Sequence, residues 1–313
     1  MRKTFILMSI ITLFLCSVFI LWGVSFHDEF IIFKRLIRLG TIALASICLA
    51  VSTVIFQTLT HNRILVPAVM GYESFYLLWQ VLVLFLFGPV SITFLGLTGN
   101  FLSSILLLLI YAFILHYVLL PIFKNDTYFS LLFGFILSMV LATLAQFFQL
   151  WMSPGEFTIF QSLTNTSFNR SNLDILIYSS IILLPILILL QRCLSILDVL
   201  SLGKNQSISL GINYAKYKAL FLILIAILVA ISTSLVGITL FMGIFIANIA
   251  YLIIKNGKHK DILPVATMVS VMVFLIAQLV VEHFFNYRIT VSILVNLVCG
   301  IYYLFFIIFA RKI

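Results

Sequence analysis

Two arginines near the start of the chain, Arg35 and Arg38, have the type and spacing to bind carboxylates. They are three residues apart, so a helix would present both guanidinium groups on one side. An arginine forms paired, charge-assisted hydrogen bonds with a carboxylate, which suits docking of an acidic partner or an anionic solute. A second interpretation stays open, because cations near a membrane surface also serve as anchors at lipid headgroups.

Polar residues inside otherwise apolar stretches form a second group of candidates. Glu73 follows Pro67 and Gly71 near the expected beginning of a helix, where an ionisable side chain is a functional candidate by default. The alternative is a structural carboxylate near the positive end of its own helix, paired with Arg63. Side-chain amides elsewhere would line a path for a polar solute or hydrogen-bond a neighbouring helix. These amides are Gln57, Gln146 and Gln149.

Two glycines, Gly237 and Gly243, occur six residues apart among hydroxyl side chains and predict a break in a helix near the outer face. Irregular backbone survives at membrane depth only where protein or a water-filled cavity satisfies its polar groups. The pair therefore marks either the wall of a pore or a close contact between helices.

The polar segment 200–217 separates two apolar runs that are each long enough to cross a bilayer. Gly203 and Gly211 bracket residues 204–210, which have the length of about two helical turns. Gly211 stands where a left-handed residue ends a helix. We predict a short helix that lies against the membrane and is available to a soluble partner. A solvated loop without a partner is the alternative.

Several kinds of catalytic chemistry are absent from the sequence. It contains no G-x-x-x-x-G-K-[ST] phosphate loop, so the chain does not hydrolyse nucleotide by itself. It contains no HExxH motif and no His/Cys cluster with zinc spacing, which argues against a metal site. Its nine carboxylates occur mostly in predicted loops, a poor basis for a proton relay. We therefore expect neither an enzyme nor a bound metal or cofactor.

Membrane-spanning helices must position these residues. The chain has 313 residues, of which 64% are hydrophobic and 9% charged, and a soluble core cannot absorb that much apolar surface. Its apolar runs reach the roughly 20 residues of a helical span and lack the alternation of a barrel strand. We predict an all-α polytopic protein with about ten spans. Their ranges are 4–24, 39–60, 68–88, 99–122, 128–152, 174–193, 215–236, 241–255, 262–282 and 290–310.

The cations follow membrane topology rather than a nucleic-acid site, although the net charge is +9. With the N-terminus inside, 13 of the 18 lysines and arginines fall on the cytoplasmic side and 5 outside. Both termini and the segment 200–217 are therefore predicted to be cytoplasmic. Because no linker or composition shift divides the chain, residues 1–313 are expected to form one membrane domain.

Four motifs occur in order along nearly the whole chain. They are Arg35-Leu36-Ile37-Arg38 with Gln57, Asn62, Pro67 and Gly71; Leu200 to Gly203 with Leu210 to Ile212; Gly237, Phe241 and Gly243; and Leu263-Pro264. Together they resemble the signatures of the FecCD family, the permease subunits of ABC importers for iron–siderophore complexes, haem and cobalamin. The resemblance implies a permease that moves ferric siderophore across the cytoplasmic membrane.

The chain departs from that family's pattern in several places. Ile238 stands where the family has a proline, and Glu282 stands where it has an arginine in the ninth span. We interpret Arg288 as the residue that supplies the missing outer cation. The motifs Met70 to Ser74 and Cys299 to Tyr303 resemble the catecholate, petrobactin-type branch, which usually pairs two different permeases.

The resemblance also implies partners. They are two ATP-binding subunits, a second permease, an extracellular substrate-binding lipoprotein, ferric siderophore and membrane lipid, with no nucleic acid. The lipoprotein's carboxylates would engage Arg35, Arg38 and Arg288. The residues that would couple to the ATPases are Ser201, Leu202, Gly203, Lys204, Ser207, Leu210 and Gly211.

Two other functions stay open at this point. One is an ABC permease for haem or cobalamin. The other is a secondary transporter driven by protons or sodium, with Glu73 as the coupling site.

Overall fold

The computed structural model describes residues 2–23, 29–119, 127–170, 172–239, 241–254 and 257–310. Helices dominate these ranges, and none of the residues described is in a strand. The elements are α1 (Arg2–Leu21), α2 (Glu29–Thr60), the 3-10 helix η1 (Pro67–Met70), α3 (Tyr72–Phe87), α4 (Val90–Phe113), the π-helix η2 (Ile114–Leu119), α5 (Thr127–Gln149), α6 (Pro154–Thr164), α7 (Leu173–Leu200), α8 (Lys204–Ser209), α9 (Tyr214–Val236), α10 (Met242–Ile253), α11 (His259–His283) and α12 (Val291–Ala310).

The helices have the lengths and composition of a polytopic membrane protein. Among the described residues, seven helices are long and apolar enough to cross a membrane: α1, α2, α4, α5, α7, α9 and α11. Three shorter apolar helices, α3, α10 and α12, bring the set close to the ten spans predicted. The all-α, multi-pass prediction is therefore confirmed. Lys124, Lys255, Arg311 and Lys312, which entered the count of cytoplasmic cations, lie outside the described residues.

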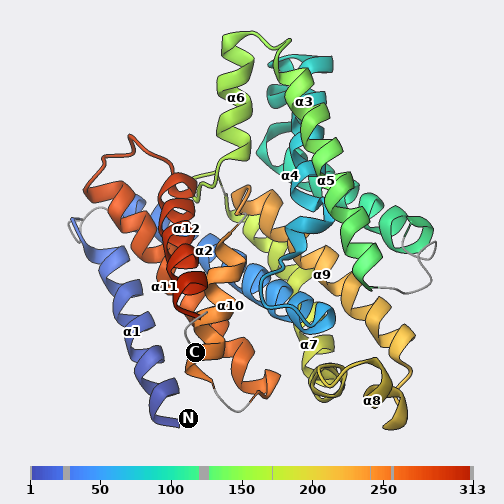
Figure 1. Cartoon of the computed structure of the whole chain (residues 1–313). Coiled ribbons are helices and arrows are strands. Elements are labelled where there is room, and N and C mark those ends of the chain that lie inside the picture. The colour runs from blue at the N-terminus through green and yellow to red at the C-terminus, as the bar shows by residue number, and fades with distance from the viewer. Residues whose placement is uncertain are drawn as a thin grey trace.

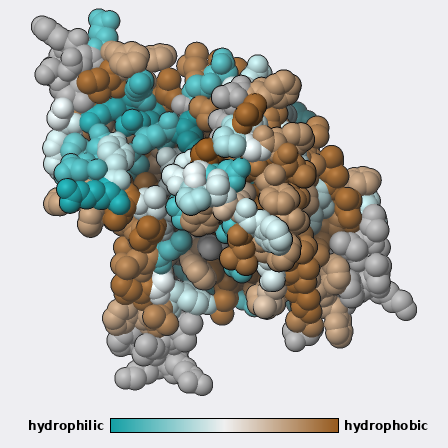
Figure 2. All heavy atoms as spheres, turned by 90° about the horizontal axis from the view of Figure 1, so that it is seen from above, coloured by the Kyte–Doolittle hydropathy of each residue, from teal (hydrophilic) through white to brown (hydrophobic). Residues whose placement is uncertain are grey.

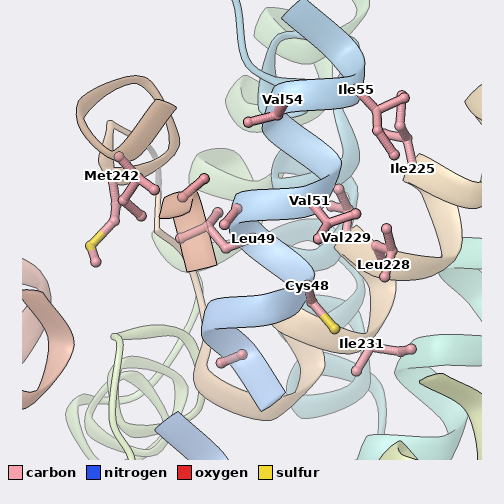
Figure 3. Packing of buried hydrophobic residues seen from close by; sticks show 14 of the residues in the cluster. Cys48, Leu49, Val51, Val54, Ile55, Ile225, Leu228, Val229, Ile231 and Met242 are labelled. Atoms are coloured by element: carbon pink, nitrogen blue, oxygen red, sulfur yellow. The ribbon is translucent and has the colours of Figure 1, made fainter. Parts of the chain in front are cut away.

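Helix α2 forms the centre of the bundle and contacts α1, α7, α9, α10 and α11 (Figure 1). Most of its middle is buried, which is typical of a helix that other helices surround. Figure 3 shows Cys48, Val51 and Ile55 of α2 beside Leu228 and Ile231 of α9. All five side chains are at most 3% exposed. This packing fixes the position of every candidate residue on α2.

The outer helices expose apolar surface instead. In their most apolar stretches only 6% of residues are buried in α1 and 11% in α5, against 72% in α2. Figure 2, seen from above, shows hydrophobic residues over much of the right-hand side and hydrophilic residues toward the upper left. Apolar surface of this extent requires lipid or another membrane subunit to cover it.

Three spans differ from the sequence-based ranges by seven residues or more, among them α7, which ends at Leu200 instead of residue 193. Helix α2 begins ten residues earlier than predicted, because the cations near its start do not end the helix. Helix α4 begins at Val90 instead of residue 99, and it is kinked at Gly96, where φ is 61°. Gln80 of α3 donates from its side-chain amide to Asn100 at 3.3 Å and to Ser104 at 3.0 Å.

The predicted outer loop 153–172 contains the helix α6. Ser153 caps it by accepting from the Glu156 backbone N–H, and the Glu156 carboxylate accepts from the Ser153 backbone. This capping box is readable in the sequence as S-x-x-E with proline at the first helical position. The eighth span, by contrast, is short as expected: the 12 residues of α10 extend only about 18 Å.

Candidate functional site

The polar segment between α7 and α9 forms the short helix α8, at the bottom of the bundle in Figure 1. Its end has the hydrogen bonds of a Schellman motif. The Gly211 N–H donates to the Ile208 carbonyl at 2.9 Å, and the Ile212 N–H donates to the Ser207 carbonyl at 3.0 Å. The predicted short helix and its terminal glycine are therefore confirmed.

Left-handed glycines stand at both ends of α8. Gly203 has φ 102° and Gly211 has φ 81°. No atom lies within 4 Å of the place that a Cβ would take at either position. The backbone conformation, and not crowding, therefore requires glycine at these two turns.

Helix α8 is anchored on one side and exposed on the other. The buried Ser207 hydroxyl lies 3.0 Å from the Val199 carbonyl of α7 and 2.7 Å from the Gly203 carbonyl, so its proton can donate to either. Leu202, Ile208 and Leu210 are 52%, 54% and 61% exposed. We call these three side chains the α8 apolar face. A fixed, exposed apolar face of this kind suits a protein partner.

At the opposite end, Arg35 has an internal partner in place of the external carboxylate expected from the sequence. Its guanidinium is buried and donates to the Glu282 carboxylate of α11 at 2.7 Å. The same group donates to the Phe19 and Trp22 carbonyls at 2.9 and 2.7 Å. The last carbonyls of a helix lack intrahelical donors and carry the negative end of its dipole. Arg35 therefore joins the outer ends of α1, α2 and α11.

Arg38 and Arg288 lie at the same outer edge and reach solvent. Arg38 donates to the Tyr287 hydroxyl at 3.2 Å, and its guanidinium lies 3.8 Å from the Glu282 carboxylate. Burial raises the pKa of the Tyr287 phenol, which keeps it protonated. Arg288, the next residue, is exposed. These two arginines, and not Arg35, present cations at this edge.

Glu73 lies in the first turn of α3 and is buried. One carboxylate oxygen accepts from the Thr239 backbone N–H at 3.2 Å, while the other has no hydrogen-bond partner among the described residues. Arg63 lies over the Tyr251 ring, 4.8 Å from its centroid, so the pairing of Arg63 with Glu73 considered from the sequence is wrong. Glu73 instead satisfies part of the irregular backbone that follows α9.

Other backbone groups of that irregular segment form hydrogen bonds with the loop between α6 and α7. The Ser167 N–H donates to the Val236 carbonyl at 3.0 Å, and the Ile238 N–H donates to the Thr164 carbonyl at 3.1 Å. A Cβ at Gly237 would lie 2.5 Å from the Thr164 carbonyl oxygen. The backbone of the loop after α6 therefore packs directly against the break at Gly237.

Arg170 fastens this loop, and the sequence carries no signal for that role. Its guanidinium donates to the carbonyls of Leu163, Asn165 and Val236, the last two at 2.6 and 2.9 Å. Burial lowers the pKa of the Arg170 guanidinium from its ordinary value. The charged Arg170 side chain therefore holds the loop at the end of α9 by donating hydrogen bonds to backbone carbonyls.

Gly243 also marks a close contact between helices. A Cβ there would lie 2.4 Å from the Thr53 hydroxyl oxygen of α2 and 3.2 Å from a Val66 methyl carbon. For both Gly237 and Gly243, the structure favours the packing interpretation over that of a pore wall.

Gln57 contributes to a polar hollow of about 540 Å³, at the place where α2 and α10 end and α11 begins. Its side-chain amide donates to the Arg63 carbonyl at 2.8 Å. His61, Arg63 and His259 also line the hollow. Gln57 is thus the amide candidate for which the structure shows a polar hollow.

Gln146 and Gln149 lie on α5, near the surface of the single chain. Gln146 is exposed and Gln149 is half-buried. Nearer the start of the same helix, the Ser138 hydroxyl lies 2.8 Å from the Ser74 hydroxyl of α3. A path lined by these glutamines would therefore run along the outside of this chain and need a second subunit to enclose it.

A comparison with known families identifies the family to which the chain belongs. The model of the FecCD transport family matches residues 4–310. This chain belongs to the FecCD transport family. The left-handed Gly203 and Gly211 and the α8 apolar face are therefore features of a FecCD chain.

Curated relatives of this FecCD chain include import permeases. The chain is 34% identical to the petrobactin import system permease protein YclO of Bacillus subtilis, over 89% of both chains. It is 30% identical to the petrobactin import system permease protein FatC of Bacillus anthracis, over 87% of this chain and 77% of that one.

Solved structures show the same fold. A chain from an inward-facing metal-chelate type ABC transporter superposes with a TM-score of 0.85 at 22% identity, over 100% of this FecCD chain and 99% of that one. A chain from PsaBC of Streptococcus pneumoniae gives a TM-score of 0.58 at 15% identity, over 87% and 90% of the two chains. The all-α bundle is thus the fold of ABC transporter membrane subunits.

Proposed function

We propose that this chain is the permease subunit of an ABC importer that moves ferric siderophore across the cell membrane. The observation that carries the proposal is the α8 apolar face, held by two left-handed glycines at one end of a multi-pass bundle. A chain without a phosphate loop cannot hydrolyse ATP, so it needs a contact through which another subunit moves it. Family membership supports this use of α8.

The substrate class is proposed from the relatives. Both curated relatives named above are petrobactin import permeases, and each is at least 30% identical to this chain over most of its length. A ferric catecholate siderophore is therefore the substrate that we favour over haem or cobalamin. We propose two ATP-binding subunits below α8, a second permease, and a substrate-binding lipoprotein at the edge that carries Arg38 and Arg288.

Transport assays with the assembled complex test this proposal. The chain is co-expressed with a second permease, the ATP-binding subunits and the binding lipoprotein, and the complex is reconstituted in liposomes. We expect uptake of radiolabelled iron–siderophore to require ATP on the side that carries α8. Uptake is expected to continue when proton and sodium gradients are dissipated. The same siderophore without the lipoprotein serves as the control.

Glu73→Gln separates the proposal from an ion-coupled transporter. Glutamine keeps an oxygen that can accept from the Thr239 N–H, so the fold is preserved. We expect ATP-dependent uptake to persist in this variant. Loss of uptake in Glu73→Gln, together with uptake by the unaltered protein after ATP depletion, would instead show that Glu73 couples transport to an ion gradient.

A further inference from the structure

A hollow of about 870 Å³ opens between α7 and α11, at the end of the bundle that we predict to be cytoplasmic. Its lining changes from apolar to charged along its length. The apolar part is formed by Ile47, Val51, Leu187, Leu190, Leu194 and Leu263. The charged part is formed by Asp198, Lys258, His259 and Lys260.

The apolar part reaches well into the membrane. On α7 the lining residues run from Leu187 to Asp198, which corresponds to about 16 Å at a rise of about 1.5 Å per residue. That is about half of the roughly 30 Å hydrocarbon core of a bilayer. Because α7 and α11 have the length and composition of membrane-spanning helices, we expect lipid chains to border this part of the hollow.

The mouth of the hollow carries two lysines and one carboxylate, Asp198. Lys258 and Lys260 are exposed, and among the described residues no carboxylate lies within ion-pairing distance of either ammonium group. The nearby Asp198 carboxylate is already engaged, since it accepts from the His259 backbone N–H at 2.9 Å and lies 2.6 Å from its ring Nδ1.

Helix α11 starts at this mouth. It begins at His259 and has 25 residues, and its first turn contains Asp261. The N-terminus of a helix carries partial positive charge, and here its first N–H already donates to the Asp198 carboxylate. The cations that stay available at the mouth of the apolar groove are therefore the two exposed lysines.

We propose that this hollow binds an anionic phospholipid of the surrounding leaflet. The phosphate lies between Lys258 and Lys260, and an acyl chain lies between α7 and α11. Basic pockets between membrane-spanning helices at a cytoplasmic surface are suited to such headgroups. A soluble protein could not reach the apolar residues deep in the bilayer, whereas a lipid chain is already at that depth. The proposal depends on membrane insertion and not on the proposed transport function.

The bound lipid has a structural consequence. Asp198, at the mouth, stands three residues before Ser201, where the α8 turn begins. A lipid between α7 and α11 would brace the end of α7 that holds α8. Helices α7 and α11 contact each other less than either contacts α2, so a lipid chain between them would add packing contacts.

Native mass spectrometry of the full-length chain in detergent tests the site. Phosphatidylglycerol, phosphatidylcholine and inorganic phosphate are titrated separately into the delipidated protein. We expect phosphatidylglycerol to bind preferentially and long-chain forms to bind more tightly than short-chain forms. The double variant Lys258→Gln, Lys260→Gln should bind phosphatidylglycerol about 30-fold more weakly, since each lysine near a surface strengthens anionic-lipid binding roughly five-fold.

Two further variants separate the groove from general charge. Ser195→Trp places a bulky side chain in the apolar part without changing charge, and it should also lose phosphatidylglycerol. The control Lys3→Gln, Arg192→Gln removes two exposed cations that lie outside the hollow, and it should bind as the unaltered chain does.

Three outcomes overturn the proposal. One is equal binding of phosphatidylglycerol and phosphatidylcholine. Another is unchanged phosphatidylglycerol binding in the Lys258 and Lys260 double variant. The third is displacement of phosphatidylglycerol by inorganic phosphate, which would show an anion site without a role for the acyl chain.

Discussion

The guanidinium of Arg35 joins the outer ends of three helices, and its burial makes the Glu282 pair important for stability. Removing one partner of a buried ion pair leaves an uncompensated charge and costs about 3–5 kcal/mol. We therefore expect Arg35→Gln and Glu282→Gln each to lower the thermal unfolding temperature of the purified protein markedly. Fluorescence-detected unfolding in detergent measures this effect.

Replacement of both partners is the matched control for that pair. The double variant Arg35→Met, Glu282→Met removes both charges, so it should be less destabilised than the sum of the single variants. Arg38→Gln, whose side chain is 25% exposed, should change the unfolding temperature little. An Arg35→Gln protein as stable as the unaltered one would contradict the assigned role.

Gly243 tests whether a glycine serves packing or a pathway. Because a Cβ would lie 2.4 Å from the Thr53 hydroxyl, Gly243→Ala should destabilise the protein by about 1–3 kcal/mol. Adding Thr53→Ala removes the nearest atoms and should restore part of the lost stability, as measured by thermal unfolding. Normal stability of Gly243→Ala combined with altered uptake would favour the pathway interpretation instead.

Arg38 and Arg288 remain proposed docking residues for the binding lipoprotein. Reversing both charges to Glu should weaken binding of the lipoprotein to the reconstituted complex at least ten-fold and raise its dependence on salt, because rim charges steer association. Surface plasmon resonance with immobilised complex measures both. The control Lys3→Glu, Arg192→Glu reverses two cations of the opposite end and should leave binding unchanged. Equal binding by both double variants would remove the docking assignment.

At the scale of the element, α8 depends on its two terminal turns. A β-branched residue at Gly211, where φ is 81°, is strained by roughly 1–2 kcal/mol and would disturb the Schellman ending. We expect Gly211→Val to keep ATP hydrolysis in the complex while lowering the iron transported per ATP hydrolysed. Uptake and phosphate release, measured together in liposomes, give that ratio.

Gly211→Asn is the matched control, because asparagine tolerates the left-handed conformation. It should transport iron nearly as well as the unaltered chain. Since no atom lies within 4 Å of the missing Cβ, the strain expected at this position comes from the backbone conformation. Normal coupling in Gly211→Val would show that the shape of this turn does not transmit motion.

The break between α9 and α10 shows how one element supports another. Glu73 of α3 and the loop that follows α6 supply the hydrogen bonds that the irregular backbone lacks. Arg170 holds that loop in place through backbone carbonyls. Any movement of α10 relative to α9 must therefore also involve α3 and α6.

At the scale of the whole molecule, a buried centre contrasts with exposed outer helices. Few residues in the apolar stretches of α1 and α5 are fully buried, so lipid or another subunit must cover the rest. The exposed Gln146 on α5 suggests that this helix faces the second permease across a shared path. That residues 1–313 act as one domain stays a prediction.

Disulfide cross-linking tests the position of α5. In a background without the four native cysteines, Gln146→Cys should cross-link to cysteines placed on the facing helix of the second permease. Leu13→Cys on α1, where Leu13 is 69% exposed, serves as the control and should face lipid. Cross-linking at position 13 but not at 146 would contradict this arrangement.

The sequence by itself determined the features that depend on local composition and conformation. Apolar run lengths predicted the spans, because a hydrocarbon core demands about 20 apolar residues per helix. Gly211 predicted the end of α8, because the left-handed conformation is a property of one residue. The S-x-x-E pattern at Ser153 also carried the start of α6, although we expected a loop there.

Only the tertiary structure decided which polar residues have partners inside the protein. Arg35 looked like an exposed cation, yet Glu282, 247 residues away along the chain, holds it. Gly243 needs glycine because Thr53 of another helix is close. Arg170 matters because it joins the carbonyls of Leu163 and Asn165 to that of Val236, 66 residues away along the chain. These roles arise from contacts between segments far apart in sequence, which no local pattern of residue types encodes.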